Sequence, residues 1–248
     1  CIPRWPVGTS AATIALCDEV TNLVFKAWAE VLPERAMAGM GEYCAANFIG
    51  SGTTAHSGES YVHVFYLAAS GGGAVRGHDG IPHMFGACIM GNMGYESIEL
   101  VELARPLIVW ETTAVTDSGG AGEFRGAVGV RQRIQPVDHT MHIGYCGSGH
   151  TCAAFGLDGG HAGMPADHWI VEQASDKVCA KLANAGASDV APTQAWVAQT
   201  GGGGGAGRPH RRAAEAVLAD VVDGFVSLAA AREIYGVVLK EAEGGYAI

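Results

Sequence analysis

DSGGAGEFRGAVGVRQRI, residues 117–134, is the stretch that decides the fold. Its first half is a glycine-dense turn. Its second half alternates, so that one face of a strand carries Val128, Val130, Gln132 and Ile134. The preceding segment, PLIVWETTAV at 106–115, is rich in β-branched and aromatic residues and predicts another strand. We therefore predict two strands joined by a glycine-rich turn.

The turn also presents residues that could contact a substrate or a phosphate, namely Arg125, Ser118, Gly119 and Gly120. A phosphate-binding loop normally opens a helix whose N-terminal amides hold the anion, and no helical pattern follows Gly126. Two uses of Arg125 stay open. Its guanidinium can bind a carboxylate or phosphate with two hydrogen bonds, or it can anchor the turn through backbone carbonyls.

Composition indicates a folded chain with an unusual surface. The 248 residues are 48% hydrophobic with a mean hydropathy of +0.17, enough for a sizeable core. Glycine, at 37 residues, is about twice as frequent as usual, and charged residues make up only 16%. Such a weakly charged surface predicts cover by partner proteins. The net charge of −10 and the lack of a basic stripe argue against nucleic-acid binding.

The seven cysteines are odd in number, scattered and never spaced CxxC, which favours reduced thiols in a cytoplasmic protein. No apolar run of membrane-spanning length occurs, so we expect no membrane association. Cys1 could act as an N-terminal nucleophile. The extended segment that follows it, with Pro3 and Pro6, favours a structural interpretation instead.

Helical periodicity marks both ends of the chain. Apolar residues at three- and four-residue steps predict a long N-terminal helix that Thr9 or Ser10 caps and Pro33 ends, with its apolar stripe facing the core. Residues 208–248 predict a tail with a short helical pair: Ala213 to Val222, and Leu228 to Tyr235 with Ser227 as its cap, followed by a last strand at 237–239.

The middle of the chain predicts strands and irregular segments. Residues 61–67, YVHVFYL, predict a strand buried on both faces, with His63 as a core histidine. Residues 160–200 are polar and weakly periodic and predict a surface excursion. We therefore expect a single α+β domain over 1–248, with a glycine-rich mixed or antiparallel sheet core.

Histidines supply the other candidate site residues. His78, Asp79 and His83 lie close together in a glycine-dense region and suggest a pocket, but their spacing matches no known ligand pattern, so no metal is assigned. On a strand, His139 and His142 would point to opposite faces. His150 ends a loop sequence, GSGH, where a titrating group can meet a substrate, so it is the candidate catalytic residue.

The run GGGGGAG at 201–207 formally contains GxGxxG, the dinucleotide-binding fingerprint. Five consecutive glycines exceed what that fingerprint needs. Arg208 and Pro209 interrupt the helix entry, and no strand with an acidic end follows at the right distance. We therefore do not assign a dinucleotide site.

Several of these segments together resemble the hydantoinase B/oxoprolinase family. They are SGGAGEFRGAVGV, GGGGGAGRP and the ending VLADVVDGFVSLAAAREIYGVVL. Within the family, DGIPHMFGACIMGNMGYESIELVELARPLIV and GSGH followed by GLDGG look most like the large subunit of acetone and acetophenone carboxylases. The similarity covers about residues 27–239 and corresponds to the C-terminal portion of a B-type subunit.

The resemblance implies an ATP-dependent multi-subunit enzyme. A hydantoinase A-like partner would bind ATP and phosphorylate a ketone, amide or lactam, and the B-type subunit would complete carboxylation or hydrolysis. In the carboxylase branch, a phosphoenol-activated ketone reacts with carboxyphosphate derived from bicarbonate. A divalent metal, Mn or Zn, is expected to assist.

This chain departs from the family in length. Family B-type subunits are two to three times longer, and their metal-binding part lies in an N-terminal half that has no counterpart here. The resemblance therefore implies either a fragment of such a subunit or one piece of a split subunit whose other half a partner supplies, and no metal ligand is carried over to this chain. Two other functions stay open: an ATP-dependent amidohydrolase of the hydantoinase, 5-oxoprolinase or lactamase type, and a non-catalytic scaffold subunit.

Overall fold

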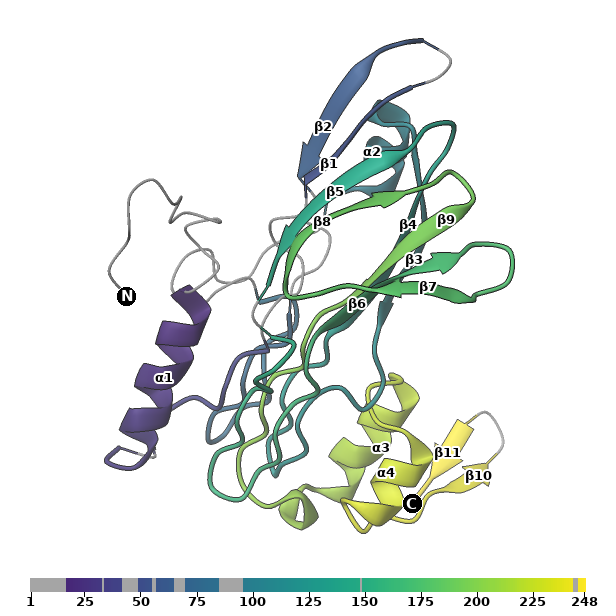
Figure 1. Cartoon of the computed structure of the whole chain (residues 1–248). Helices are drawn as coiled ribbons and strands as arrows, with labels where there is room; N and C mark the ends of the chain where they lie inside the picture. The colour runs from purple at the N-terminus through teal and green to yellow at the C-terminus, as the bar shows by residue number, and fades with distance from the viewer. Residues whose placement is uncertain are drawn as a thin grey trace.

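The structure, a computed structural model, describes residues 17–32, 34–41, 49–54, 57–64, 70–84, 96–147, 149–242 and 245–248. These residues form two larger β-sheets, a bundle of glycine-rich segments and a C-terminal region of helices with a two-stranded sheet (Figure 1). The predicted α+β class is confirmed, and every strand pair among the described residues is antiparallel. Within these same ranges, no helix has the length and apolar character needed to span a bilayer.

The larger sheet has five strands in the order β3-β4-β9-β6-β7. Their bounds are β3 Leu107–Ala114, β4 Val130–Pro136, β9 Gln194–Gln199, β6 Asp167–Glu172 and β7 Val178–Lys181. The two strands predicted around the glycine turn are β3 and β4, and they pair directly. Alternate residues of β4 are buried, as the sequence pattern predicts, because one face of this strand covers the core.

The second sheet has four strands in the order β2-β1-β5-β8. Their bounds are β2 Ser60–Val64, β1 Ile49–Thr53, β5 Met141–Cys146 and β8 Ala185–Val190. Ile134 and Trp196 of the larger sheet share one core cluster with Met141 and Ile143 of the smaller sheet, and all four are at most 1% exposed. The two sheets therefore pack face to face.

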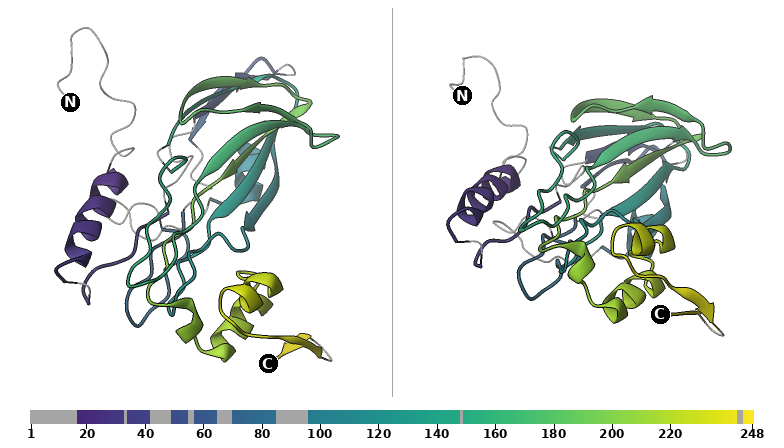
Figure 2. Two further views of the ribbon diagram at one scale, coloured as in Figure 1. Left: turned by 60° about the horizontal axis from the view of Figure 1, so that its bottom comes forward. Right: turned by 90° about the horizontal axis from the view of Figure 1, so that it is seen from below.

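The glycine-rich segments form a bundle next to the sheets, visible as extended chains running side by side in Figures 1 and 2. Residues 201–206 are buried at its centre. The amides of Gly202 and Gly205 both donate to segment 161–164, each over 3.0 Å, and those of Gly203 and Ala206 both donate to segment 124–127, each over 2.9 Å. Donor directions thus repeat every third residue, the periodicity of a polyproline II helix with about three residues per turn.

Close packing explains why this bundle needs glycine. A Cβ atom at Gly202 would overlap the carbonyl oxygen of Ser118, and one at Gly204 would overlap that of Phe155. Further segments surround the central one and bond to it or lie against it: 38–41, 71–74, 118–120 and 154–157. The five-glycine run is therefore a buried structural core of the bundle.

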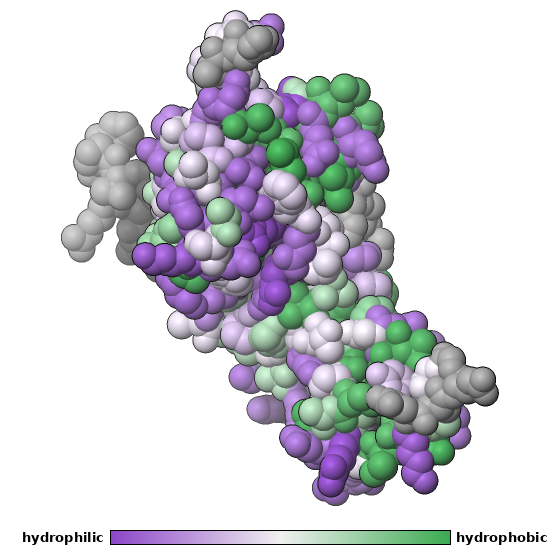
Figure 3. Space-filling view, turned by 90° about the vertical axis from the view of Figure 1, so that its right-hand side faces the viewer, coloured by the Kyte–Doolittle hydropathy of each residue, from purple (hydrophilic) through white to green (hydrophobic). Residues whose placement is uncertain are grey.

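The C-terminal region packs beside the bundle. A 3₁₀ turn, Pro209–Arg211, leads to α3 (Ala214–Val222), α4 (Leu228–Glu233) and a hairpin of β10 (Lys240–Ala242) and β11 (Gly245–Ala247). The amide of Ala230 donates to Ser227 Oγ over 3.0 Å, so the predicted cap of α4 is confirmed. Much of the surface here is apolar (Figure 3), with Val222 64% and Val238 60% exposed.

The N-terminal helix differs from its prediction. The helix α1 covers Cys17–Ala29, and the predicted start at Thr9 or Ser10 lies outside the described residues. The prediction that its apolar stripe faces the core is wrong, since Leu23 is 65% and Val31 76% exposed. A further helix, α2 (Ile98–Ala104), was not predicted; the hydroxyl of Ser97 caps it.

Other predictions need correction in the sheets. Segment 160–200 is no surface excursion, because it supplies β6, β7, β8 and β9, and β9 lies in the middle of the larger sheet. The strand predicted at 61–67 is the edge strand β2, whose residues are largely exposed, and 65–67 lie outside the described residues. No strand forms at the predicted 237–239; the chain ends instead in the hairpin of β10 and β11.

Candidate functional site

Arg125 lies in the glycine turn but points toward the C-terminal helices. It is 7% exposed. Its Nε donates to Asp220 Oδ1 over 3.1 Å, and Nη1 donates to the Gly126 carbonyl over 2.7 Å. The guanidinium also lies 4.9 Å from the centre of the Phe225 ring. Arg125 therefore anchors the turn to α3.

Arg212 and Asp79 extend this contact into a network of two arginines and two aspartates, of which Arg125, Arg212 and Asp220 are buried and Asp79 is partly exposed. Arg212 donates from Nη1 and Nη2 to the two carboxylate oxygens of Asp79, each over 2.7 Å, and from Nε to Asp220 Oδ2 over 2.9 Å. Burial by itself would raise the pKa of Asp79, but the hydrogen bonds and charge of Arg212 hold that pKa below its usual value. The network is thus charge-balanced and joins the bundle to the C-terminal region.

The other turn residues are also engaged with the protein. Ser118 Oγ donates to the Val115 carbonyl over 2.5 Å and accepts from the Gly129 amide over 2.8 Å. The Gly120 amide donates to the Gly203 carbonyl over 2.7 Å. A phosphate site needs amides that point into solvent. A phosphate contact by Arg125, Ser118, Gly119 or Gly120 stays a prediction that these bonds do not favour.

His78, Asp79 and His83 do not form one cluster of side chains around a pocket. Asp79 belongs to the network above, and His78 lies in an exposed turn closed by backbone bonds with Val75. His83 is half-buried with φ of 59°, and burial lowers its pKa. Across the described ranges, no three His, Cys, Asp or Glu side chains come together in a way that could hold a metal ion.

His150 lies elsewhere, beside the end of the smaller sheet. Both of its ring nitrogens are buried without a hydrogen-bonding partner among the residues that the structure describes, and its ring centre is 4.8 Å from that of His168. Burial lowers the pKa of His150, against the opposing charge of Asp167. A neutral imidazole with two unsatisfied nitrogens is suited to bind or accept a proton from a ligand.

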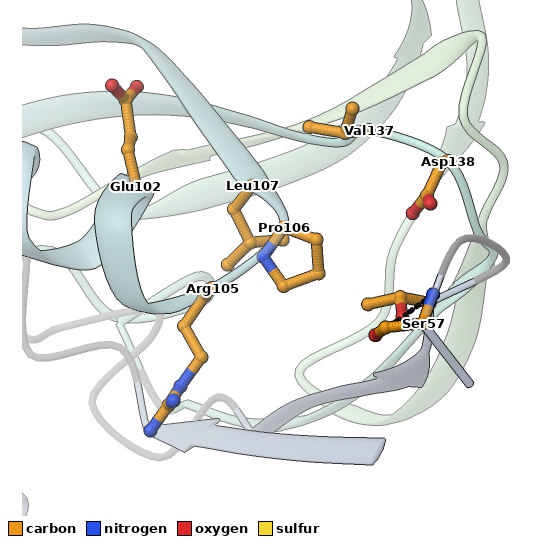
Figure 4. Close-up of a pocket in the computed structure, with 8 residues that line it drawn as sticks. Ser57, Glu102, Arg105, Pro106, Leu107, Val137 and Asp138 are labelled. Carbon is orange, nitrogen blue, oxygen red and sulfur yellow. Dashed lines mark hydrogen bonds between the residues drawn. The ribbon is translucent and has the colours of Figure 1, made fainter. Parts of the chain in front are cut away.

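A groove that the sequence did not indicate lies between the β1–β2 hairpin and the turn from α2 to β3. Two adjoining hollows of about 280 and 330 Å³ share Thr54, Arg105 and Pro106. Figure 4 shows the first, with the carboxylate of Asp138 and the side chain of Ser57 on the same side of it. The Nε of Arg105 is buried without a hydrogen-bonding partner in the described part of the chain.

Asp138, His139 and Tyr61 form a hydrogen-bonded chain at this groove. His139 Nδ1 lies 3.3 Å from Asp138 Oδ1, and His139 Nε2 lies 2.7 Å from the Tyr61 hydroxyl. An ionised carboxylate only accepts, so a neutral His139 carries its proton on Nδ1 and accepts from the Tyr61 hydroxyl. The His139 side chain is 2% exposed. Tyr61 lines the second hollow, so its hydroxyl can turn from His139 toward a group bound there.

Burial raises the pKa of Tyr61, while the charge of Arg105 opposes this rise. Tyr61 is therefore a neutral phenol at neutral pH, able to donate a proton rather than to act as a phenolate. Tyr61 and His139 are 78 positions apart. A single sequence carries no pattern that links them, since their contact depends on how β2, β1 and β5 pair.

Of the other predicted histidines, His63 behaves as expected. His63 is 9% exposed and lies 3.4 Å from Glu96, as a core histidine with a partner. His139 is buried, whereas the His142 side chain is 63% exposed and pairs with Asp189. His139 lies in the turn between β4 and β5 and not on a strand, so the prediction of opposite strand faces does not apply to this pair.

The sequence model of the Hydantoinase B/oxoprolinase family matches residues 1–209, which is most of the chain. The chain therefore belongs to the hydantoinase B/oxoprolinase family.

Three curated relatives illustrate the range of this family. The chain is 30% identical over 96% of its length to the beta subunit of the caprolactamase of Pseudomonas jessenii, and covers 42% of that protein. It is 29% identical over 98% of its length to the B-type subunit of a putative D-/L-hydantoinase from a Pseudomonas species, covering 40% of it. It is 29% identical over 75% of its length to the acetone carboxylase alpha subunit of Xanthobacter autotrophicus, covering 28% of it.

Two solved structures have the same fold as this chain. The ATP-dependent caprolactamase of Pseudomonas jessenii superposes with a TM-score of 0.72 at 26% identity, over 88% of this chain and 38% of that one. Nucleotide-free acetone carboxylase shares the fold with a TM-score of 0.70 at 24% identity, over 86% of this chain and 32% of that one. The chain thus spans about two fifths or less of the length of these relatives.

Proposed function

We propose that this chain is the C-terminal part of a B-type subunit in an ATP-dependent, cytoplasmic, multi-subunit enzyme that hydrolyses an amide bond in a lactam, hydantoin or related small molecule. The observation that carries the proposal is the match to the caprolactamase beta subunit, which runs over 96% of this chain at 30% identity. A match of that extent leaves little of the chain unaccounted for.

Ketone carboxylation is the second candidate. The segment from Asp79 to Val109 resembles the large subunit of acetone carboxylases, and the alpha subunit of such an enzyme is 29% identical. This match covers 75% of the chain, against 96% and 98% for the two amide-linked relatives. The wider coverage is why we place amide hydrolysis first.

In the proposed enzyme, several subunits contribute to the reaction. ATP would bind the hydantoinase A-like partner, which would phosphorylate the substrate. A divalent metal, Mn or Zn, would polarise substrate oxygens. Because the described residues hold no group of three ligands, we do not assign that metal to them.

Within this chain, two places offer side chains to a substrate: His150 with its unsatisfied nitrogens, and the groove with Arg105 and the chain Tyr61, His139 and Asp138. The Arg105 guanidinium is suited to a carboxylate or carbonyl oxygen. The Tyr61 hydroxyl is suited to donate a proton to a leaving nitrogen or oxygen.

A substrate panel on the assembled complex tests the proposal. ADP release would be measured with lactams and hydantoins, and separately with acetone or acetophenone plus bicarbonate. We expect ADP release coupled to ring opening in the first set only. Carboxylated product from the ketones would establish the second candidate instead. A complex that releases ADP with neither set, although fully assembled, would leave only the scaffold role.

A further inference from the structure

The helix α1 carries an apolar stripe on the face that points away from the rest of the structure. Its members recur at steps of three, one and four along the helix and are Val20 (57% exposed), Leu23 (65%), Val24 (43%) and Trp28 (54%), and Val31 (76%) continues the stripe in the turn that follows the helix. Single exposed apolar residues are ordinary on protein surfaces. A continuous stripe along one face of a helix is instead typical of a contact surface.

The opposite face of α1 fixes how the helix is oriented. The Asn22 side chain donates to the Met40 carbonyl over 3.1 Å and accepts from the Met40 amide over 2.8 Å, both as buried bonds. Lys26 Nζ lies 5.9 Å from the centre of the Phe155 ring, and Ala29 packs against the alanine cluster around Ala38. Rolling the helix to bury the stripe would break these contacts, so the exposure of the stripe is a property of the fold.

The position of α1 leaves room for a partner. Figures 1 and 2 show the helix at the periphery, with the glycine bundle on one side of it only. Asn22 and Ala29, which face the bundle, are small or polar, whereas the outward residues are large and apolar. The apolar face of α1 therefore points outward and its small and polar residues face the bundle, the reverse of an ordinary surface helix. This arrangement is expected for a helix whose apolar face is covered by a second protein body.

We infer that this stripe is the docking surface for the remaining part of the B-type subunit, the polypeptide that the relatives contain beyond the region matched here. The chain matches the caprolactamase beta subunit over 96% of itself but over only 42% of that protein. More than half of the relative therefore lies beyond the matched fold.

The partner surface is predicted to be apolar and helical. Residues at these steps present ridges that fit the grooves of another helix, and burial of such side chains is the main driving force of association. The acidic net charge of −10 is carried elsewhere, since none of the five stripe residues is charged. This inference rests on the B-type assignment but not on which reaction the enzyme performs.

Site-specific crosslinking in the assembled complex tests the inference. A photo-crosslinking amino acid would replace Leu23, and a second sample would carry it in place of Leu103, an apolar helix residue that is 83% exposed on α2. We expect crosslinked peptides from the additional B-type polypeptide with the Leu23 probe and not with the Leu103 probe. Crosslinks from Leu23 to a second copy of this chain, to the ATP-binding partner or to nothing would overturn the inference.

Hydroxyl-radical footprinting supplies an independent measurement. Trp28 should be oxidised at least about tenfold more slowly in the complex than in the isolated chain, since docking would bury its ring. Trp110, which is 55% exposed on β3, is the matched comparison and should change less. Equal oxidation of Trp28 in both samples would contradict docking. Because neither readout uses turnover, docking without activity would leave this inference standing while the proposed reaction failed.

Discussion

His150 is the predicted catalytic residue, and its buried, unsatisfied ring nitrogens make it testable. We expect His150→Ala in the assembled complex to lower kcat about 100-fold, the usual size of a lost general acid or base, with unchanged subunit stoichiometry. His142→Ala is the control, because His142 is exposed and pairs with Asp189 on the neighbouring strand. Normal turnover in the His150 variant would remove this residue from the site.

Substitution of Tyr61 tests whether the groove takes part in the reaction. Tyr61→Phe keeps the ring but removes the hydroxyl that lies 2.7 Å from His139 Nε2. If Tyr61 donates a proton to the substrate, kcat should fall by at least about tenfold with little change in KM. Tyr145→Phe, which removes a hydroxyl bonded to Ser188 over 3.1 Å, controls for the loss of a structural hydrogen bond. Equal, small effects of both changes would make the groove a structural feature.

His168 predicts how stability depends on pH. Burial lowers the pKa of His168 to about 4 from an ordinary value of 6.5. Between these values the unfolded chain binds a proton at this residue and the folded chain does not. Stability is therefore fully present above pH 6.5 and is lost as the pH falls toward 4, by at most about 3 kcal/mol.

Urea unfolding of the chain at about pH 7.5 and about pH 4.5, on either side of the ordinary histidine pKa, measures this loss. The free energy of unfolding should differ less between the two pH values in His168→Gln than in the wild type, because the contribution of His168 is gone. His142→Gln should leave this difference unchanged. A pH dependence that is the same in wild type and in both variants would show that another group is responsible.

The close packing of the glycine bundle predicts that a side chain on one segment displaces the segment beside it. A Cβ at Gly202 would meet backbone atoms of Ser118 and Gly119, which cannot move without displacing their own segment. We expect Gly202→Ala to destabilise the chain by at least about 2 kcal/mol. Gly144→Ala on β5 is the matched control, because a methyl group there would have no neighbour within 4 Å and the loss should stay below about 1 kcal/mol. Unfolding midpoints in urea would compare them, and equal midpoints would contradict close packing.

The sequence predicted those strands in which burial of one face leaves a pattern of apolar residues. The strands β3 and β4 follow from β-branched residues and from alternation, because β4 has one buried face. The strands β7 and β8 gave no such pattern. All four residues of β7 are exposed, and β8, AGASDV, holds only one buried residue, Val190. Backbone pairing alone forms these strands, and side-chain periodicity does not record it.

The molecule as a whole is expected to function in a complex. Apolar residues are exposed on α1 and around the C-terminal helices, and charged residues make up only 16% of the chain. Native mass spectrometry of material purified from the source should therefore find this region together with a hydantoinase A-like chain and the rest of a B-type subunit. A stable 25.5 kDa species without partners would contradict the subunit assignment.

Local sequence was enough to determine several properties of this protein. Alternation placed β3 and β4, capping residues placed α4, and the repeated glycine motifs indicated the family. These are short-range properties, since periodicity and the steric demand for glycine act over a few residues.

Only the tertiary structure decided which distant residues meet and which face of each helix is covered. Arg125 reaches Asp220, 95 positions away, and His139 reaches Tyr61. The apolar stripe of α1 was predicted to face the core, yet the bonds of Asn22 to Met40 turn it outward. Such contacts depend on the order in which strands and segments pack, and hydrophobic periodicity cannot say whether an apolar face meets its own core or a partner.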